Sequence, residues 1–484
     1  MLRSALHEKV STILVEPSLL GDLRSKRAPY GHDGALEPLV PTRDPSSSPV
    51  HHSLGAFLLP LCLRCGHVHC KLTHVSLADT FDISNQHLSM ELASAMCTVF
   101  QANPGVRYIN FSGSNIVDRQ QYMGKIMSCP RLRLQSLNLS FCKLGGGGAI
   151  KELANALLHM SSPVLELSLV GNEMNTQDVQ DLSSWLETNT VLKLLDLGMN
   201  QKIGRAGLDP LAQALSRAGH PLQSLGLSGI GLNDDSVDAL AQLVLDENFK
   251  AEFLDVSWNV LGVTGLGNLP SIFGKIKSVR ELHCMALKLS PEATRRMIES
   301  YRGNHTIEVL HLASNYISVV SAPMFVELLQ ECPNMKWLDL VSNDVSPSFI
   351  STIHPAINAA HNLTILSLSN CTCNDEGAQI LANVLSTNST LLEVHFNFNN
   401  LTDAAAFPIA SALKLHNKTL RNLRLDENEI GYDGVQALLE ALQYNNSLVY
   451  LDLSENDFDP AQYETAPPSY PNVPSRVIKF VISE

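Results

Sequence analysis

The chain has 484 residues, of which 45% are hydrophobic and only 17% are charged. At roughly 100–200 residues per domain, this length predicts several domains or an architecture that grows by adding repeats. The low charged fraction excludes a charge-rich disordered protein. The 48 acidic and 34 basic side chains give a net charge of −14, which is the wrong sign for binding nucleic acid by counterion release.

Compartment and membrane signals are weak along the whole chain. No stretch of about 18 consecutive apolar residues is present, and Glu8 and Lys9 interrupt the place where a signal peptide has its apolar core. We therefore expect a protein of the cytoplasm or nucleus with no membrane span. The ten cysteines form no dense framework, so we expect reduced thiols rather than disulfides.

The N-terminal segment 1–70 contains a Pro/Ser-rich stretch (38–49) and no repeat, which predicts a largely disordered arm. At its end lie Cys62, Cys65, His67, His69 and Cys70. The CxxC pair could begin a zinc site, but no convincing second ligand pair follows. We therefore expect neither a metal ion nor any other cofactor, and we interpret the cluster as a thiol-rich entry to the first repeat.

A nine-residue pattern, LxxLxLxxN/C, then recurs along most of the chain. Its spacing is nearly constant, and only the gap between the first two units is clearly longer than the others. The fourteen units start at Leu72, Val106, Leu134, Val164, Leu192, Leu222, Ala251, Val279, Ile307, Met335, Leu363, Leu391, Leu420 and Leu448. We expect a repeat domain over residues 71–463.

Each unit predicts a short strand whose leucines point inward, followed by a turn and a helix. The ninth position, for example Asn343 or Cys371, lies where a polar side chain can satisfy the backbone of the turn. Helical spacing is clearest over 375–388 and 432–445. Because helices are wider than strands, their stacking predicts an α/β solenoid of about 14 repeats, a horseshoe with a concave parallel sheet and convex helices.

The repeat period, about 28 residues, and the element LxxLxLxxNxIGxDGxxALLEAL, from Leu420 to Leu442, resemble the ribonuclease-inhibitor-like class of leucine-rich repeats. The resemblance covers about four-fifths of the chain. It implies the fold but not one function, since the class includes nuclease inhibitors, GTPase-activating proteins, innate-immune receptors, actin-capping regulators and phosphatase-regulating scaffolds.

The outward positions of successive strands predict a partner-binding ladder on the concave face. Trp337, flanked by His311 and Asp339, is the best single anchor, because Trp is frequent at interface hot spots; the alternative is that it packs on Val309 and Ile365 without a partner. The predicted contact residues are Asp255, His283, Met285, His311, Trp337, Asp339, His395, Arg424, Tyr450 and Asp452.

The same ladder places Asp255, His283, His311 and Asp339 side by side. By residue type alone, these side chains could form a catalytic group of histidines and carboxylates. We expect no enzyme and no catalytic residue, because a flat sheet offers no enclosed pocket and its backbone amides are already paired.

Residues 464–484 predict a proline-rich linker and a short extended segment. Arg476, Ile478 and Phe480 fit [RK]-x-[VI]-x-[FW], which resembles the docking motif of protein phosphatase 1 regulatory subunits. Such a segment can dock as an edge strand. The alternation of Val477, Lys479 and Val481 also suits a strand that folds back onto the array, and both interpretations remain open.

We therefore predict a non-enzymatic protein-interaction scaffold or regulator that binds a protein partner on its concave face. One alternative is a phosphatase 1 regulatory subunit that docks through RVIKF. Another is a GTPase-activating or actin-regulatory protein of the same repeat class. The acidic tail of the Ran-activating proteins is missing here, since only Glu464 and Glu484 are acidic after Tyr463. The partner's identity and the oligomeric state stay open.

Overall fold

The computed structural model describes residues 79–461, except for residues 103, 130, 161 and 220, together with residues 477–480. The predicted arm over 1–70, its Cys/His cluster, Arg476 and the linker preceding it lie outside the described residues. None of the helices in the described ranges is long and apolar enough to span a membrane.

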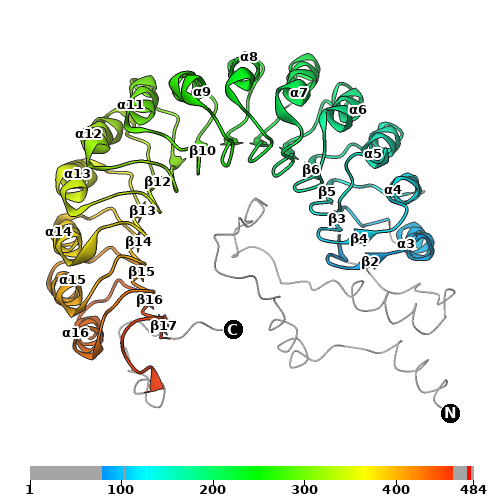
Figure 1. Ribbon diagram of the computed structural model, residues 1–484. Helices are drawn as coiled ribbons and strands as arrows, with labels where there is room; N and C mark the ends of the chain where they lie inside the picture. Colours follow the sequence, from blue (N-terminus) through cyan, green and yellow to red (C-terminus); the bar gives the residue numbers. More distant parts are fainter. Residues whose placement is uncertain are drawn as a thin grey trace, which may run out of the picture. The chain divides into compact units, whose positions relative to one another are not determined.

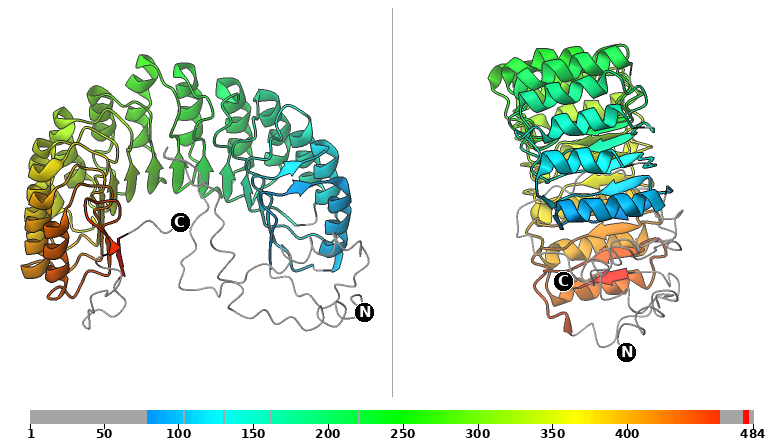
Figure 2. Two further views of the ribbon diagram at one scale, coloured as in Figure 1. Left: turned by 60° about the horizontal axis from the view of Figure 1, so that its bottom comes forward. Right: turned by 90° about the vertical axis from the view of Figure 1, so that its right-hand side faces the viewer.

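The repeat array is one parallel sheet with a helical layer on its outer side (Figure 1). Figure 2 shows the strands lying side by side along the concave side. The strands are β1 (Thr80–Asp82), β3 (Tyr108–Asn110), β5 (Ser136–Asn138), β6 (Glu166–Ser168), β7 (Leu194–Asp196), β8 (Ser224–Gly226), β9 (Phe253–Asp255), β10 (Glu281–His283), β11 (Val309–His311), β12 (Trp337–Asp339), β13 (Ile365–Ser367), β14 (Glu393–His395), β15 (Asn422–Arg424), β16 (Tyr450–Asp452) and β17 (Val477–Lys479). The predicted solenoid of fourteen repeats is confirmed, and β17 adds a fifteenth strand.

The helices follow the strands in regular alternation. They are α3 (Met90–Ala102), α4 (Arg119–Met127), α5 (Ala149–Leu158), α6 (Thr176–Leu186), α7 (Gly204–Ala218), α8 (Val237–Val244), α9 (Val263–Asn268), α10 (Pro270–Phe273), α11 (Pro291–Ser300), α12 (Ala322–Glu331), α13 (Pro347–Ala359), α14 (Asn374–Thr387), α15 (Asp403–Leu415) and α16 (Tyr432–Leu442). Two 3-10 turns (Asp234–Ser236 and Val319–Ser321) and a small two-stranded sheet of β2 (His87–Leu88) and β4 (Asn115–Ile116) complete the described elements.

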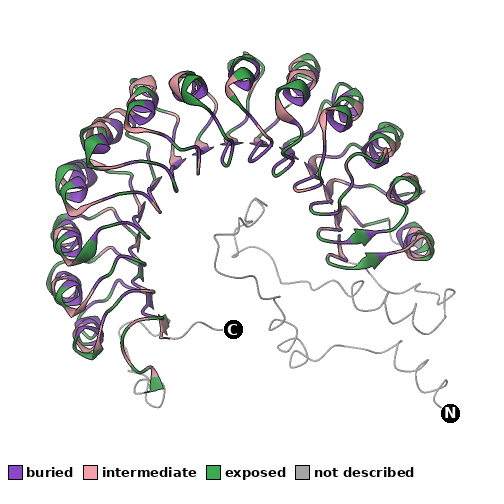
Figure 3. Ribbon diagram, viewed as in Figure 1, coloured by how far each residue is buried: buried purple, intermediate pink, exposed green. Residues whose placement is uncertain are grey.

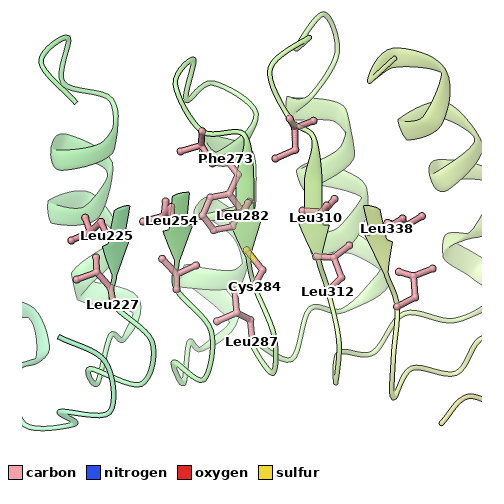
Figure 4. Close-up of a cluster of buried hydrophobic side chains, with 14 of the residues drawn as sticks. Leu225, Leu227, Leu254, Phe273, Leu282, Cys284, Leu287, Leu310, Leu312 and Leu338 are labelled. Carbon is pink, nitrogen blue, oxygen red and sulfur yellow. The ribbon is translucent and has the colours of Figure 1, made fainter. Parts of the chain in front are cut away.

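The core lies between the sheet and the helices. Figure 3 shows the buried residues along the inner side of the helices and through the strands. The central residue of each strand points into this layer; Leu254, Leu282 and Leu310 are fully buried and stack in successive repeats (Figure 4). This stacking follows from the register, since each residue pairs with its equivalent one repeat later. One continuous core therefore fixes which strand side chains face outward.

Asparagine at the ninth position ties neighbouring turns together. Asn343 Nδ2 donates to the carbonyls of Leu312 and Leu340, both at 3.0 Å, and its Oδ1 accepts from the amides of Asn315 and Ile317, both at 3.1 Å. One buried side chain thus satisfies backbone groups of two repeats, as predicted for this position.

The first repeat begins later in the chain than predicted. Its strand is β1, which pairs with β3 so that Thr80 lies opposite Tyr108, the equivalent residue of the next repeat. Phe81 and Ile83 occupy the two inward positions and are buried. The longer first gap in the predicted series arose because leucine was expected at the two inward positions. Phe81 and Ile83 fill these positions equally well.

The expectation of reduced thiols is wrong for one pair. Cys97 in α3 and Cys129, just after α4, form a disulfide with their Cα atoms 5.3 Å apart. Helices of consecutive repeats pack side by side, which brings residues 32 positions apart together. Within the described part of the chain five further cysteines are free and buried, namely Cys142, Cys284, Cys332, Cys371 and Cys373.

At the other end, β17 pairs in parallel with β16. Ile478 and Phe480 pack against the core, and the Phe480 ring lies edge-on to Phe458 with 5.9 Å between centroids. Lys479 Nζ lies 3.4 Å from Asp452 Oδ2. Of the two interpretations of this segment, the structure adopts the strand that folds back onto the array.

Candidate functional site

The candidate site is the concave face of the sheet, formed by the first and third residues of each strand. Because side chains alternate across a strand, the inward leucine fixes the two flanking residues on the opposite face. The parallel register places equivalent residues of neighbouring repeats directly beside one another. Residues one repeat apart in the sequence therefore form continuous rows across the sheet.

An aromatic row crosses four strands at the centre of this face. The rings of Phe253, His283, His311 and Trp337 follow one another from β9 to β12, each edge-on to the next. The centroid separations are 4.9, 4.2 and 4.3 Å. Trp337 thus packs against an imidazole, and its indole nitrogen donates to Ser367 Oγ at 3.0 Å.

The two imidazoles of this row are each held by a carboxylate. His283 Nε2 lies 2.8 Å from Glu281 Oε1, and His311 Nδ1 lies 2.8 Å from Asp339 Oδ2. Both histidines are buried, at 6% and 7% exposure. Because a carboxylate accepts only, the bonded nitrogen of each ring carries the proton. In the neutral rings, the lone pair then remains on His283 Nδ1 and on His311 Nε2.

A hydrogen-bonded chain continues from Trp337 toward the C-terminal end. Ser367 Oγ lies 2.9 Å from His395 Nδ1, and His395 Nε2 lies 2.6 Å from Glu393 Oε1. Glu393 accepts the Nε2 proton, so Nδ1 accepts from the Ser367 hydroxyl, whose oxygen accepts from Trp337. The His395 bond is the largest of the contacts that lower the pKa of Glu393.

This serine–histidine–glutamate chain has the composition of a nucleophilic triad but not its accessibility. Ser367 is 1% exposed, and its oxygen already accepts the indole proton. A nucleophile needs a free path to the substrate and donors for the developing oxyanion. The arrangement therefore stabilises the ladder rather than activating Ser367.

The C-terminal end of the ladder is more charged. Arg424 is exposed, whereas Asp452 is 3% exposed and accepts from Tyr450 Oη at 2.8 Å. Burial alone would raise the pKa of Asp452, but hydrogen bonds from Ser454 and Tyr450, with the charge of Lys479, hold it below its usual value. Burial and the bond to Asp452 raise the pKa of Tyr450 to about 12.

Two carboxylates on β7 and β9, nearer the N-terminal end of the ladder, lie in a less polar setting. Burial raises the pKa of Asp196 on β7 to about 6, and it also raises the pKa of Asp255 on β9. Gly226 lies between them on β8, and a Cβ there would be 2.3 Å from Asp196 Oδ1. The glycine therefore leaves the room that the Asp196 side chain occupies.

The structure places the ten predicted contact residues in three settings. Asp255, His283, His311, Asp339 and Asp452 are buried; Met285, Trp337, His395 and Tyr450 are half-buried; Arg424 is exposed. Val309 and Ile365, which the packing alternative for Trp337 named, lie beside it in register, and its ring also contacts His311 and Ser367. His311 and Asp339 contact each other across two strands, whereas His283 and Asp452 contact Glu281 and Tyr450 of their own strands.

Sequence reasoning missed the bulky residues at the eighth position of some units. Trp258 and Phe398 are 43% and 48% exposed, and both have positive φ, near +58° and +56°. Gly171 and Gly229 occupy the same position elsewhere, as expected for left-handed backbone. The sequence signal for these exposed residues was an aromatic residue at a position that favours glycine or asparagine.

Comparisons with known proteins agree with this architecture. A family model described as Leucine Rich repeat matches residues 134–151, 188–212, 359–382, 387–410, 416–439 and 444–461. The ribonuclease inhibitor of Sus scrofa is 28% identical over 66% of this chain and 69% of its own length. The Homo sapiens NACHT, LRR and PYD domains-containing protein 3 is 26% identical over 61% of this chain but only 28% of its own length.

Among solved structures, an internalin from Listeria monocytogenes covers 89% of this chain and 95% of its own, at 13% identity and a TM-score of 0.38. The sequence period, the parallel sheet and the family match together define a leucine-rich repeat protein. Its repeats are of the ribonuclease-inhibitor-like type, as the similarity to the inhibitors of Sus scrofa and Mus musculus indicates.

Proposed function

We propose that the chain is a non-enzymatic scaffold or regulator that binds a protein partner along its concave face. The observation that supports this most directly is the exposed face of the 15-stranded sheet, on which Trp337, Arg424 and Tyr450 remain partly or fully accessible. These are the residue types that dominate binding energy at protein interfaces. The buried groups Ser367 and Asp452 hold Trp337 and Tyr450 in defined positions, which lowers the entropic cost of binding.

The proposed surface has two roles for its residues. Trp337, His395, Arg424 and Tyr450 would contact the partner, and Met285 would extend the surface toward the centre of the array. Asp255, His283, His311, Asp339 and Asp452 are buried and would act mainly by positioning their neighbours. Substitution of the first group should weaken binding with little effect on folding, and substitution of the second should affect both.

Quantitative affinity capture with the full chain tests this proposal. The triple variant Trp337→Ala, Arg424→Ala, Tyr450→Ala should capture most of the proteins bound by the unchanged chain in amounts lower by roughly tenfold or more. The reason is that hot-spot residues carry most of the binding energy. Arg205→Ala is the matched control, because this arginine lies on the outer helix α7 and is also solvent-accessible. Equal capture by all three chains, with unchanged circular dichroism, would contradict a concave-face site.

A second proposal is docking of protein phosphatase 1 through residues 476–480. The observation that favours it is local: Val477–Lys479 already adopts the extended strand that this docking mode requires. Ile478 and Phe480, however, pack on the array, and Lys479 is tied to Asp452. Docking would therefore require β17 to leave β16, so the array and the phosphatase would compete for the segment.

Direct binding of purified phosphatase 1 to the full chain distinguishes these states. Phe480→Ala should abolish binding, whereas Lys479→Ala should strengthen it by releasing β17. Val477→Ala is the control, since Val477 is exposed and lies at an unspecified position of the motif. If the full chain and the Lys479→Ala variant both fail to bind, the segment is a structural cap only.

A further inference from the structure

Three side chains on the concave face form a group with the chemistry of a metal site. Glu281 and His283 lie two residues apart on β10, on the same face, and His311 lies directly opposite His283 on β11. Each contributes one potential ligand atom, and these atoms all lie within 4.8 Å of one another. A carboxylate and two imidazoles thus come together from two adjacent strands.

Both imidazoles have a nitrogen available for coordination. His311 donates from Nδ1 to Asp339, which leaves the lone pair of Nε2 for a metal. A carboxylate bonded to the other ring nitrogen is the usual partner of a metal-binding histidine, because it fixes the tautomer and orients the ring. Asp339 has this position without being a ligand itself.

His283 is the less satisfied of the two rings. Its side chain is buried, and Nδ1 has no hydrogen-bond partner among the described residues. Buried polar atoms are rarely left without a partner. Since Glu281 lies at Nε2, a metal held by both residues would bind His283 through Nε2 in place of the present contact, and the ring proton would then lie on Nδ1. The cation would bind a ring that the fold alone leaves incompletely bonded.

The surroundings also favour a cation. Phe253 and Trp337 flank the two imidazoles along the row, so the group is partly shielded from water. Asp255 lies beside His283, and Asp339 beside His311. With Glu281, three carboxylates surround two imidazoles, and a divalent ion would offset this local excess of negative charge.

We propose that Glu281, His283 and His311 bind one Zn²⁺ ion on the concave face. Two imidazoles and one carboxylate are a zinc ligand set with a fourth position open to water. Ligands bound at roughly 2.0–2.2 Å in a tetrahedron lie roughly 3.3–3.6 Å apart. The Glu281–His283 contact of 2.8 Å would therefore open slightly, and the remaining ligand atoms would move closer together.

The chain contains a matched control for this site. Glu393 and His395 on β14 repeat the Glu-x-His pattern and make the same kind of contact, at 2.6 Å. Their neighbours in register are Ser367 on β13 and Arg424 on β15 rather than a second histidine. This group has one imidazole, so it lacks the ligand number that zinc requires.

The test is zinc binding by the full chain after removal of metal, measured by calorimetric titration and by metal analysis after dialysis. Cys62→Ser, Cys65→Ser and Cys70→Ser are included in every protein, so that the N-terminal cysteines do not contribute. We expect one equivalent of zinc. His283→Asn and His311→Asn should each weaken binding by about 100-fold or more, and Asp339→Asn by about 10–100-fold, the usual effect of losing an outer-shell partner. His395→Asn should bind as the parent does.

Glu281→Gln provides a second variant if the buried histidine substitutions impair folding, because the Glu281 side chain is 39% exposed. It should retain the parent circular dichroism spectrum and melting temperature in the absence of metal while binding zinc more weakly. The absorption spectrum of the Co²⁺-loaded protein should change with Glu281→Gln and not with His395→Asn. Absence of zinc binding by the parent, or equal affinity of the parent, Glu281→Gln and His311→Asn proteins, would overturn the assignment.

Discussion

Two regions of the concave face start from the same strand pattern and differ in what lies beside it. The strands β10 and β14 both carry Glu-x-His, and in both the glutamate contacts the histidine of its own strand. Beside β10, His311 completes a pair of imidazoles. Beside β14, Ser367 and Arg424 instead give a hydrogen-bonded chain and an exposed charge. The chemistry of this face is therefore set across strands, by residues one repeat apart in the sequence.

Arg424→His should transfer the metal-binding property from one region to the other. The new imidazole would lie opposite His395 on β15 and complete a second group of two histidines and one glutamate. If cross-strand neighbours decide the chemistry, the zinc stoichiometry should rise from one to two equivalents. Arg424→Gln is the control and should stay at one equivalent. A stoichiometry of one for both variants would indicate that β10 has a further requirement.

Asn343→Ala should produce the largest loss of stability. This side chain lies between the two regions and makes five bonds to backbone groups of two repeats. Removing it leaves buried amides and carbonyls without partners, so we expect a loss of about 3 kcal/mol in the free energy of unfolding. Urea unfolding followed by circular dichroism measures this loss. Asn383→Ala, on the exposed side of α14, should change stability by less than about 0.5 kcal/mol.

Asp196→Asn should stabilise the protein at neutral pH. The folded-state pKa is raised to about 6 by burial, so the folded protein binds a proton between about pH 4 and pH 6 that the unfolded chain does not. The contribution of Asp196 to stability therefore falls as pH rises through this window. Removing the charge should increase stability at pH 7 by on the order of 2 kcal/mol and flatten its pH dependence. Asp209→Asn, at a solvent-accessible position on α7, is the control for removal of a surface carboxylate.

Glu393→Gln should have a smaller effect, with the opposite sign. The bond to His395 lowers the pKa of Glu393 in the folded state, so its contribution is present above the unfolded-state pKa and is lost as pH falls through the folded-state value. Substitution should cost less than about 1 kcal/mol at pH 7 and nothing at acid pH. A loss of stability that persists at low pH would instead indicate a packing role for this side chain.

The sequence predicted the fold well because the repeat period and the strand pattern are local and recur many times. The Asn343 turn and the register of His283 beside His311 follow from spacing alone. The first repeat was placed wrongly because Phe81 and Ile83 fill leucine positions. The Cys97–Cys129 pair was missed because its two cysteines lie 32 residues apart on neighbouring helices, a separation that indicates nothing until the helices are stacked.

The candidate site was predicted as a set of positions but not as a set of contacts. The pattern placed Trp337, His311 and Asp339 on one face. The burial of His311 and Asp339, however, depends on rings and carboxylates that cover one another. The acceptor of the Trp337 indole, Ser367, depends on a rotamer and not on register alone. Side-chain direction within a row is a property of packing, which the pattern of one strand does not contain.

The sequence by itself determined the repeat, the face on which each strand residue lies and its neighbours in register. A constant repeat length sets the neighbours, and the alternation of side chains along a strand sets the face. Only the tertiary structure decided that β17 covers β16, that Ser367 is closed to solvent, and that Glu281, His283 and His311 bring ligand atoms together. These outcomes depend on side-chain rotamers and on burial by residues far apart in the chain, which are settled only when the repeats stack.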